Sequence, residues 1–93
     1  MAKTLRVEQA YTMNQAEVRE KMESVLGNMA SKYDLTIEWE SDTKVTITRS
    51  GVKGWAEIEP NRVVVELSLS FPVSALAGKV EEQLKHKMAK ELQ

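Results

Sequence analysis

The spacing of apolar residues along the chain changes from a period of two to a period near 3.6 and back, which predicts strands and helices in turn. Residues 3–11 alternate between apolar and polar side chains and predict a strand. Residues 13–33 carry one apolar stripe at helical spacing and predict a helix. Asn14 is a favourable N-cap for this helix, and Glu17 stands three residues later, as in a capping box.

Four short strands are predicted after this helix, because apolar and β-branched residues alternate with polar ones between turn residues. These strands cover residues 35–39, 44–49, 52–58 and 63–69. Their connections are short, which favours antiparallel hairpins in a meander. A second helix is predicted from Phe71–Pro72 onwards, with an apolar stripe made of Val73, Leu76, Ala77, Val80, Leu84 and Met88.

The predicted order β-α-β-β-β-β-α favours an α+β fold, in which both helices pack on one face of a five-stranded antiparallel sheet. The other face of the sheet is then exposed to water. Periodicity leaves open whether the sheet curls around the last helix, as in helix-grip folds. A chain of 93 residues suffices for one core, so we expect residues 1–93 to form a single domain.

Composition narrows the classes of function. Apolar residues make up 42% of the chain and charged residues 29%, which is typical of a globular protein. Thirteen basic and fourteen acidic residues give a net charge of -1, which disfavours nucleic-acid binding. The absence of Cys excludes disulfides, thiolate metal sites and cysteine nucleophiles. No apolar run approaches the roughly 18 residues of a spanning helix, so we expect a cytoplasmic protein without a transmembrane segment.

The residues that most often carry catalysis are few and scattered. His86 is the single histidine, and a metal site there would need Glu82 and a further ligand. Glu57, Glu59 and Glu66 are predicted near one another on the water-exposed sheet face, where carboxylates more often provide solubility than acid-base catalysis. We therefore expect no enzyme activity, no cofactor and no bound metal.

Several segments resemble those of one known family. Arg49-Ser50-Gly51-Val52-Lys53-Gly54 is preceded by Trp39-Glu40-Ser41-Asp42 and followed by Leu69-Ser70-Phe71 and by residues 75–81. These segments are similar to the polyhydroxyalkanoic acid system family, small bacterial proteins that accompany polyester-granule synthesis genes. The resemblance spans nearly the whole chain, although the family commonly has a histidine where this chain has Tyr11. It implies a cytoplasmic accessory role near storage granules and implies no reaction.

Two apolar residues are predicted on the exposed sheet face, and they provide the first hypothesis about function. Strand phase places both Trp55 and Val64 there, on neighbouring strands. They can simply pack against each other across the strands. They can also form a contact with a second copy of the chain, with a granule protein or with the polymer surface.

A second hypothesis is a small carrier of apolar ligands. Met22, Met29, Leu76 and Met88 fall on the inward stripes of the two predicted helices. Such flexible side chains can fill gaps in a core, or they can line an apolar pocket between the helices and the sheet.

Overall fold

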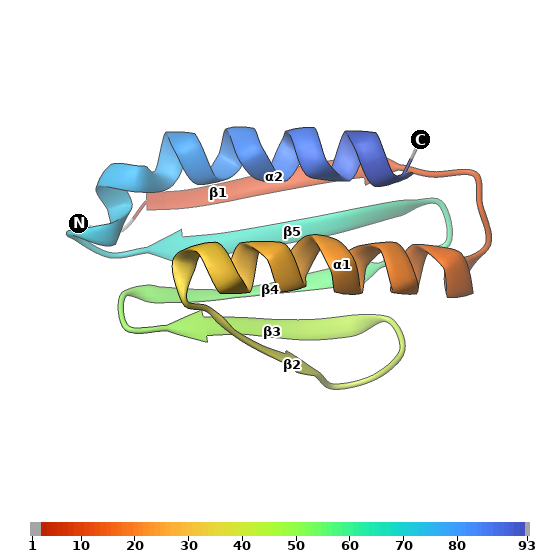
Figure 1. The fold of residues 1–93 in the computed structure, drawn as a ribbon, viewed down its shortest axis with the longest axis horizontal. Coiled ribbons are helices and arrows are strands. Elements are labelled where there is room, and N and C mark those ends of the chain that lie inside the picture. The colour runs from red at the N-terminus through yellow and green to blue at the C-terminus, as the bar shows by residue number, and fades with distance from the viewer. Residues whose placement is uncertain (1–2, 93) are drawn as a thin grey trace.

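The structure, a computed structural model that describes residues 3–92, contains a five-stranded antiparallel sheet and two long helices (Figure 1). The strand order in the sheet is β1-β5-β4-β3-β2. The elements in chain order are β1 (Lys3–Ala10), α1 (Gln15–Tyr33), β2 (Thr36–Trp39), β3 (Lys44–Arg49), β4 (Val52–Ile58), β5 (Arg62–Leu69), the 3₁₀ turn η1 (Val73–Leu76) and α2 (Ala77–Leu92). The predicted α+β fold and element order are therefore confirmed.

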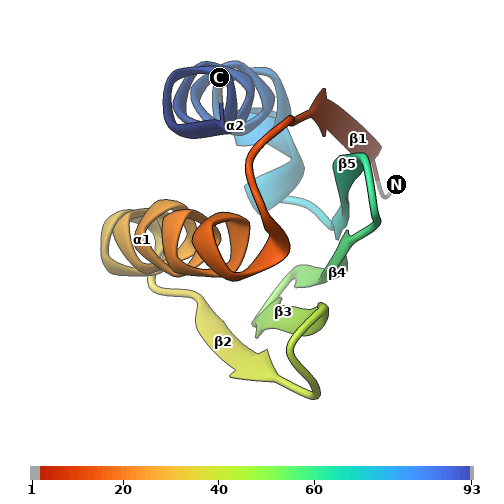
Figure 2. The same cartoon turned by 90° about the vertical axis from the view of Figure 1, so that its right-hand side faces the viewer.

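Both helices lie on the same face of the sheet, and the sheet curves around them (Figure 2). Helix α2 runs along β1, and α1 lies beside α2 over the middle of the sheet. The curvature brings the short edge strand β2 toward α1. The core fills the space between these layers, and its largest fully buried side chains include Met22, Met29, Ile47, Leu69, Leu84, Met88 and Leu92.

Helix α1 begins and ends at residues with capping geometry. The Asn14 Oδ1 atom accepts a hydrogen bond from the Glu17 backbone N–H (2.9 Å), and its Nδ2 donates to Glu17 Oε1 (2.9 Å). At the other end, Asp34 has a left-handed conformation (φ 59°), and its N–H donates to the Ala30 carbonyl. This sharp reversal ends the helix at Tyr33 and starts the path into β2.

The start of the second helix differs from the prediction, because the tight turn η1 precedes α2. The Ser74 N–H donates to the Ser70 carbonyl (3.0 Å), which bends the chain back over the end of the sheet. Gly51 lies beneath this bend with φ +86°, and a Cβ atom there would lie 3.1 Å from Val73 Cγ2. The bend therefore packs Val73 against the β3–β4 hairpin and leaves Phe71 on the surface.

Candidate functional site

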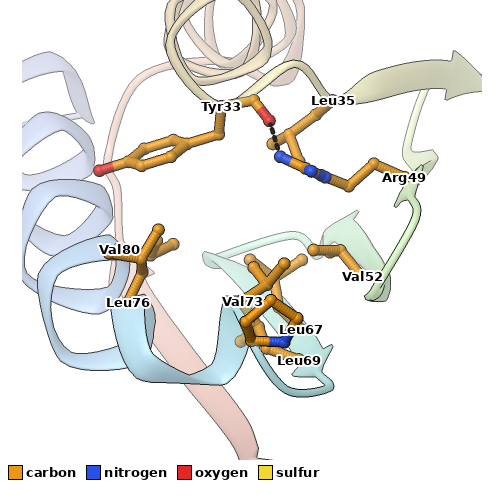
Figure 3. A pocket seen from close by; sticks show the side chains of 10 residues that line it. Tyr33, Leu35, Arg49, Val52, Leu67, Leu69, Val73, Leu76 and Val80 are labelled. Carbon is orange, nitrogen blue, oxygen red and sulfur yellow. Dashed lines mark hydrogen bonds between the residues drawn. The ribbon is translucent and has the colours of Figure 1, made fainter.

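A cavity of about 300 Å³ lies at one end of the molecule, where the end of α1 meets the start of α2 above the sheet (Figure 3). Its lining comes from the end of α1, from strands β3, β4 and β5, and from the segment that leads through η1 into α2. The lining residues are Tyr33, Leu35, Arg49, Val52, Leu67, Leu69, Pro72, Val73, Leu76 and Val80. Its volume is at the lower limit of the roughly 300–1,000 Å³ that small-molecule pockets occupy.

The sheet side of this cavity is apolar because three buried residues share one face of β4 and β5. Val52 lies directly opposite Leu69 in the antiparallel register. Leu67 precedes Leu69 by two residues on β5, so its side chain points to the same face. All three side chains are at most 4% exposed. A ligand on this side of the cavity would therefore meet only hydrocarbon.

The helix side of the cavity is held by a bond between the two helices. Tyr33, at the end of α1, places its ring against the cavity, and its hydroxyl donates to Gln83 Oε1 on α2 (2.9 Å). Leu76 and Val80 face the same space from the η1–α2 junction. The hydrogen bond fixes the ring of Tyr33, so this wall of the cavity is preorganised.

Arg49 is the charged residue of the cavity lining. It shares a face of β3 with the buried Val45 and Ile47, and it ends that strand. Its Nη1 donates to the Tyr33 carbonyl (2.8 Å) and its Nε to the Ser50 carbonyl (3.1 Å). Within residues 3–92, no carboxylate forms an ion pair with Arg49. The cavity therefore combines apolar walls with a positive charge that no acidic side chain of the described residues neutralises.

A second, more polar hollow of about 350 Å³ adjoins the cavity at Arg49. It is lined by Arg49, Gly51, Val52, Lys53, Ser68 and Ser70. Arg49 and Val52 line both spaces, so the guanidinium lies between an apolar cavity and a polar surface hollow.

An apolar rim, defined here as Phe71 and Leu76, lies next to the cavity on the surface. Phe71 is 78% exposed and Leu76 is 43% exposed, and they are the exposed large apolar side chains of the described chain. Leu76 also lines the cavity, and Phe71 directly precedes Pro72, another lining residue. Exposed apolar side chains that border a concave site are typical of a contact surface.

The cavity contains one of the four residues predicted for an apolar pocket. Leu76 lines it, whereas Met22, Met29 and Met88 are at most 2% exposed within the core and do not belong to its lining. These three methionines lie on the predicted inward stripes. They are packed in the core between the helices and the sheet, away from the cavity. The stripe of a helix identifies which residues face the sheet, whereas the cavity lies only where the end of α1 meets the η1–α2 junction.

Arg49 and Phe71 were not predicted as site residues, although the sequence carries a signal for the first. The odd positions of residues 44–49 are Val45, Ile47 and Arg49, so a charged residue occupies the apolar phase at the end of a strand. Such a residue either reaches water at the strand end or faces a polar group inside. The exposure of Phe71 depends on the bend at η1, for which periodicity gives no signal.

Trp55 lies on the sheet face that the helices leave uncovered, as predicted. It stands opposite Thr46 on β3 and Glu66 on β5, and it is half-buried. Together with neighbouring side chains it lines a hollow of about 430 Å³ on this face, made of Thr4, Thr46, Thr48, Lys53, Gly54, Trp55, Glu66 and Ser68.

The prediction that Val64 is exposed is wrong. Val64 is on the same face as Trp55, but its exposed fraction is 0%. Its strand is covered on both sides, with Glu8 of β1 and Glu57 of β4 directly opposite in the register. The long side chains of these neighbouring strands shield a short side chain between them. Val64 therefore cannot take part directly in a contact at the surface.

An ion network crosses the same outer face over β1 and β5. Arg6 binds Glu8 (2.8 Å) and Glu66 (3.0 Å), while Arg62 binds Glu8 (2.5 Å) and Glu59 (2.8 Å). The hydrogen bond from Arg6 is the largest influence on the pKa of Glu8 and lowers it; desolvation opposes this, and attraction by Arg62 adds to it. Hydrogen bonds to Glu8 and Glu66 raise the pKa of Arg6, and the hydrogen bond to Glu59 is the largest influence that raises the pKa of Arg62.

The predicted carboxylates and the histidine do not converge on one site. Glu59 and Glu66 are bound in the arginine network, and Glu57 lies opposite Lys44. His86 is exposed on α2, in a shallow hollow with Lys32, Lys79, Glu82, Gln83 and Lys87. Over residues 3–92, no group of three or more His, Cys, Asp or Glu residues is placed to hold a metal ion. None of the helices in this range is long and apolar enough to cross a membrane.

The comparisons with known proteins give one match. A family model described as "Putative polyhydroxyalkanoic acid system protein" matches residues 5–92. The chain belongs to this polyhydroxyalkanoic acid system family. The match covers both helices and nearly the whole sheet, so the resemblance predicted from the hairpin and helix segments is confirmed over the full fold. The searches of curated proteins and of solved structures found no match.

Tyr11, which the resemblance to the family singled out, has a structural position here. Its ring is buried, and its hydroxyl donates to the Glu59 carbonyl, while its N–H donates to the Asn61 carbonyl (3.2 Å). Both bonds tie the end of β1 to the β4–β5 turn. Tyr11 therefore joins elements of the fold and lies outside the cavity lining.

Proposed function

We propose that this member of the polyhydroxyalkanoic acid system family is a cytoplasmic, non-enzymatic accessory protein that binds polyhydroxyalkanoate granules through its apolar rim. The observation that carries the proposal is the exposure of Phe71 (78%) beside Leu76 (43%). Family membership supplies the setting, since the family is described as a polyhydroxyalkanoic acid system protein. An aliphatic polyester presents a hydrocarbon-rich surface, to which such side chains adsorb by the hydrophobic effect.

The proposed contact is modest for a single molecule. Fully burying one large apolar side chain contributes about 1.5–3 kcal/mol, so two residues support only weak adsorption. Many copies on one granule, or self-association of the chain, would strengthen binding by multivalency. On the outer face, Glu8, Glu59 and Glu66 are engaged with arginines, which argues against acid-base catalysis by these carboxylates.

Co-sedimentation with purified granules tests this proposal. We expect Phe71→Ser and Leu76→Ser each to lower the bound fraction severalfold, because each removes apolar surface from the rim. Trp55→Thr is the matched control, since it removes a larger side chain from the opposite side of the sheet. Circular dichroism of each variant verifies that the fold is retained.

Two results would contradict the rim assignment. A loss of granule binding in Trp55→Thr alone would place the contact on the outer sheet face. If Phe71→Ser instead turned an oligomer into a monomer and left granule binding unchanged, the rim would be an interface between copies of the chain.

The cavity favours a second candidate function, which is to carry a small apolar ligand. Its walls are hydrocarbon, its size suits a small molecule, and the Tyr33–Gln83 bond keeps one wall in place. This function differs from granule binding in its site, because the ligand lies in the cavity, although Leu76 belongs to both the rim and the cavity lining. Binding of a neutral aliphatic alcohol at this site is its simplest test, and the experiment described below includes that test.

A further inference from the structure

We infer that the cavity binds an aliphatic carboxylic acid, with the hydrocarbon chain between the helices and the sheet and the carboxylate on the Arg49 guanidinium. This inference rests on the carrier function proposed above and names the chemical class of its ligand. A hydroxyalkanoic acid belongs to this class. The cavity walls, the charge of Arg49 and the volume of the cavity each favour such a ligand.

The walls select the hydrocarbon part of the ligand. Val52, Leu67 and Leu69 form the sheet side, and Leu76 and Val80 form part of the helix side. Transfer of a methylene group from water to such surroundings raises affinity about fourfold. A linear chain therefore gains affinity for each carbon that enters.

The charge selects the head group. The two hydrogen bonds of Arg49, to the carbonyls of Tyr33 and Ser50, hold the guanidinium at the cavity but leave its charge uncompensated by any carboxylate in the described part of the chain. A guanidinium carries five N–H donors and matches a carboxylate bidentately. Because these bonds use only Nη1 and Nε, the Nη2 group remains for a ligand oxygen.

The polar hollow beside Arg49 accommodates further oxygens. Lys53, Ser68 and Ser70 line it together with Arg49. An amphipathic acid placed with its chain in the cavity therefore directs its polar end toward hydroxyl and ammonium groups. A hydroxyl near the carboxylate, as in a hydroxyalkanoic acid, would find donors and acceptors in the same hollow.

The volume sets the chain length. A space of about 300 Å³ equals roughly ten groups of the size of a water molecule, at about 30 Å³ each. A methylene group is of similar size, so a chain of medium length fits and a long-chain fatty acid does not. Decanoate is therefore a suitable probe, and 1-decanol has the same chain without the charge.

Calorimetric titration of the full chain at pH 7 tests the inference. We expect decanoate to bind at least tenfold more tightly than 1-decanol, because charge-assisted hydrogen bonds exceed neutral ones. Arg49→Gln should weaken decanoate binding about tenfold and leave 1-decanol unchanged, while Arg49→Lys should retain part of the preference. The matched control is Lys44→Gln, which removes one positive charge from the opposite face of the same strand and should alter neither affinity.

Methyl NMR of the unmodified protein provides a measurement that needs no variant. Decanoate should shift the resonances of Val52, Val73 and Leu76. Shifts confined to the outer face around Trp55, or equal loss of affinity in Arg49→Gln and Lys44→Gln, would overturn the inference.

The outcomes separate this inference from the functions proposed above. If 1-decanol binds as tightly as decanoate, the carrier function stands and the carboxylate assignment is overturned; if neither binds, both are overturned. Granule co-sedimentation in saturating decanoate distinguishes two sources of the ligand. Release from granules indicates that the cavity holds carboxylate ends of the polymer, and unchanged sedimentation indicates that it holds free acids.

Discussion

At the scale of single residues, alternation along a strand identifies the face of a side chain but not its exposure. Trp55 and Val64 share the outer face, yet Trp55 is half-buried in a surface hollow and Val64 is completely buried. The difference comes from their neighbours. Glu8 and Glu57 flank Val64 in the register, one on each neighbouring strand. A short side chain on an inner strand of a polar face can therefore be as buried as a core residue.

Gly54 gives a prediction at the same scale. An ideal Cβ atom at Gly54 would lie 2.3 Å from Leu67 Cδ2 and 2.4 Å from the Glu66 carbonyl oxygen. The second of these atoms belongs to the backbone of the paired strand, so it cannot move without disturbing β4 and β5. We expect Gly54→Ala to lower the free energy of unfolding by about 1–3 kcal/mol, measured by urea denaturation.

Gly27 provides the matched control for this substitution. It lies within α1, is exposed, and has no atom within 4 Å of the position of a Cβ. Gly27→Ala should raise the free energy of unfolding by roughly 0.5–1 kcal/mol, because alanine favours the helix. If Gly54→Ala also raised the free energy of unfolding, the steric conflict at Gly54 would be contradicted, and the propensity of alanine would dominate at both positions.

At the scale of elements, the short edge strand β2 depends on α1. The Arg19 guanidinium lies over the Trp39 ring, 3.9 Å from its centroid, and its Nη1 binds Asp42 Oδ1 (2.9 Å). Glu23, one helical turn later, lies 2.9 Å from Arg19 Nε as an ion-pair partner. Four residues make a strand that is too short to hold its own register, so contacts from the helix stabilise its place at the sheet edge.

Removal of the Arg19 contacts should loosen this edge selectively. We expect Arg19→Gln to lower the free energy of unfolding by about 1 kcal/mol, within the range of a cation–π contact. Hydrogen exchange should become faster in the β2–β3 hairpin and remain unchanged in β1 and β5. Lys21→Gln, an exposed substitution on the same helix, is the control. Uniform acceleration across the sheet would contradict a local anchoring role.

At the scale of the whole molecule, the outer face and the cavity end of the sheet have different electrostatic characters. On the outer face, Arg6 and Arg62 are bound to carboxylates in a continuous network that joins β1 to β5. At the cavity end, Arg49 has only backbone partners within residues 3–92. The chain has a net charge of -1, but the cavity end has a local excess of positive charge at Arg49. This local charge is the basis for proposing a carboxylate ligand.

The outer network predicts how stability depends on pH. Hydrogen bonding by Arg6 lowers the pKa of Glu8 below its ordinary value of 4.5. A carboxyl group whose pKa is lower in the folded state stabilises the fold above the unfolded pKa and loses this contribution as pH falls through the folded pKa. We therefore expect wild type to be more stable than Glu8→Gln at pH 7, and this difference to shrink between pH 4.5 and pH 2.

Urea denaturation at these pH values provides the measurement. Because Glu8 is solvent-exposed, added salt should reduce the difference at pH 7 as well. A difference that is independent of both pH and salt would indicate that Glu8 acts through packing over Val64 and not through its charge.

Local patterns in the chain were enough to predict the element order, the sheet face of Trp55 and the N-cap at Asn14, because periodicity, turn residues and capping depend on residues close in sequence. The candidate site was predicted only at Leu76. Met22, Met29 and Met88 were correctly placed on inward stripes, but inward residues line a cavity only where neighbouring elements fail to meet. Arg49 was detectable as a charge in an apolar strand phase.

The cavity itself, the exposure of Phe71 and the burial of Val64 required the folded structure. Each depends on which distant segments lie nearby: the end of α1 and the start of α2 for the cavity, the bend at η1 for Phe71, and the strands on both sides of β5 for Val64. Burial and free volume are properties of the space between elements, and that space is fixed by helix packing and sheet curvature. A repeating pattern of apolar residues gives the direction of each side chain, whereas packing determines what that side chain meets.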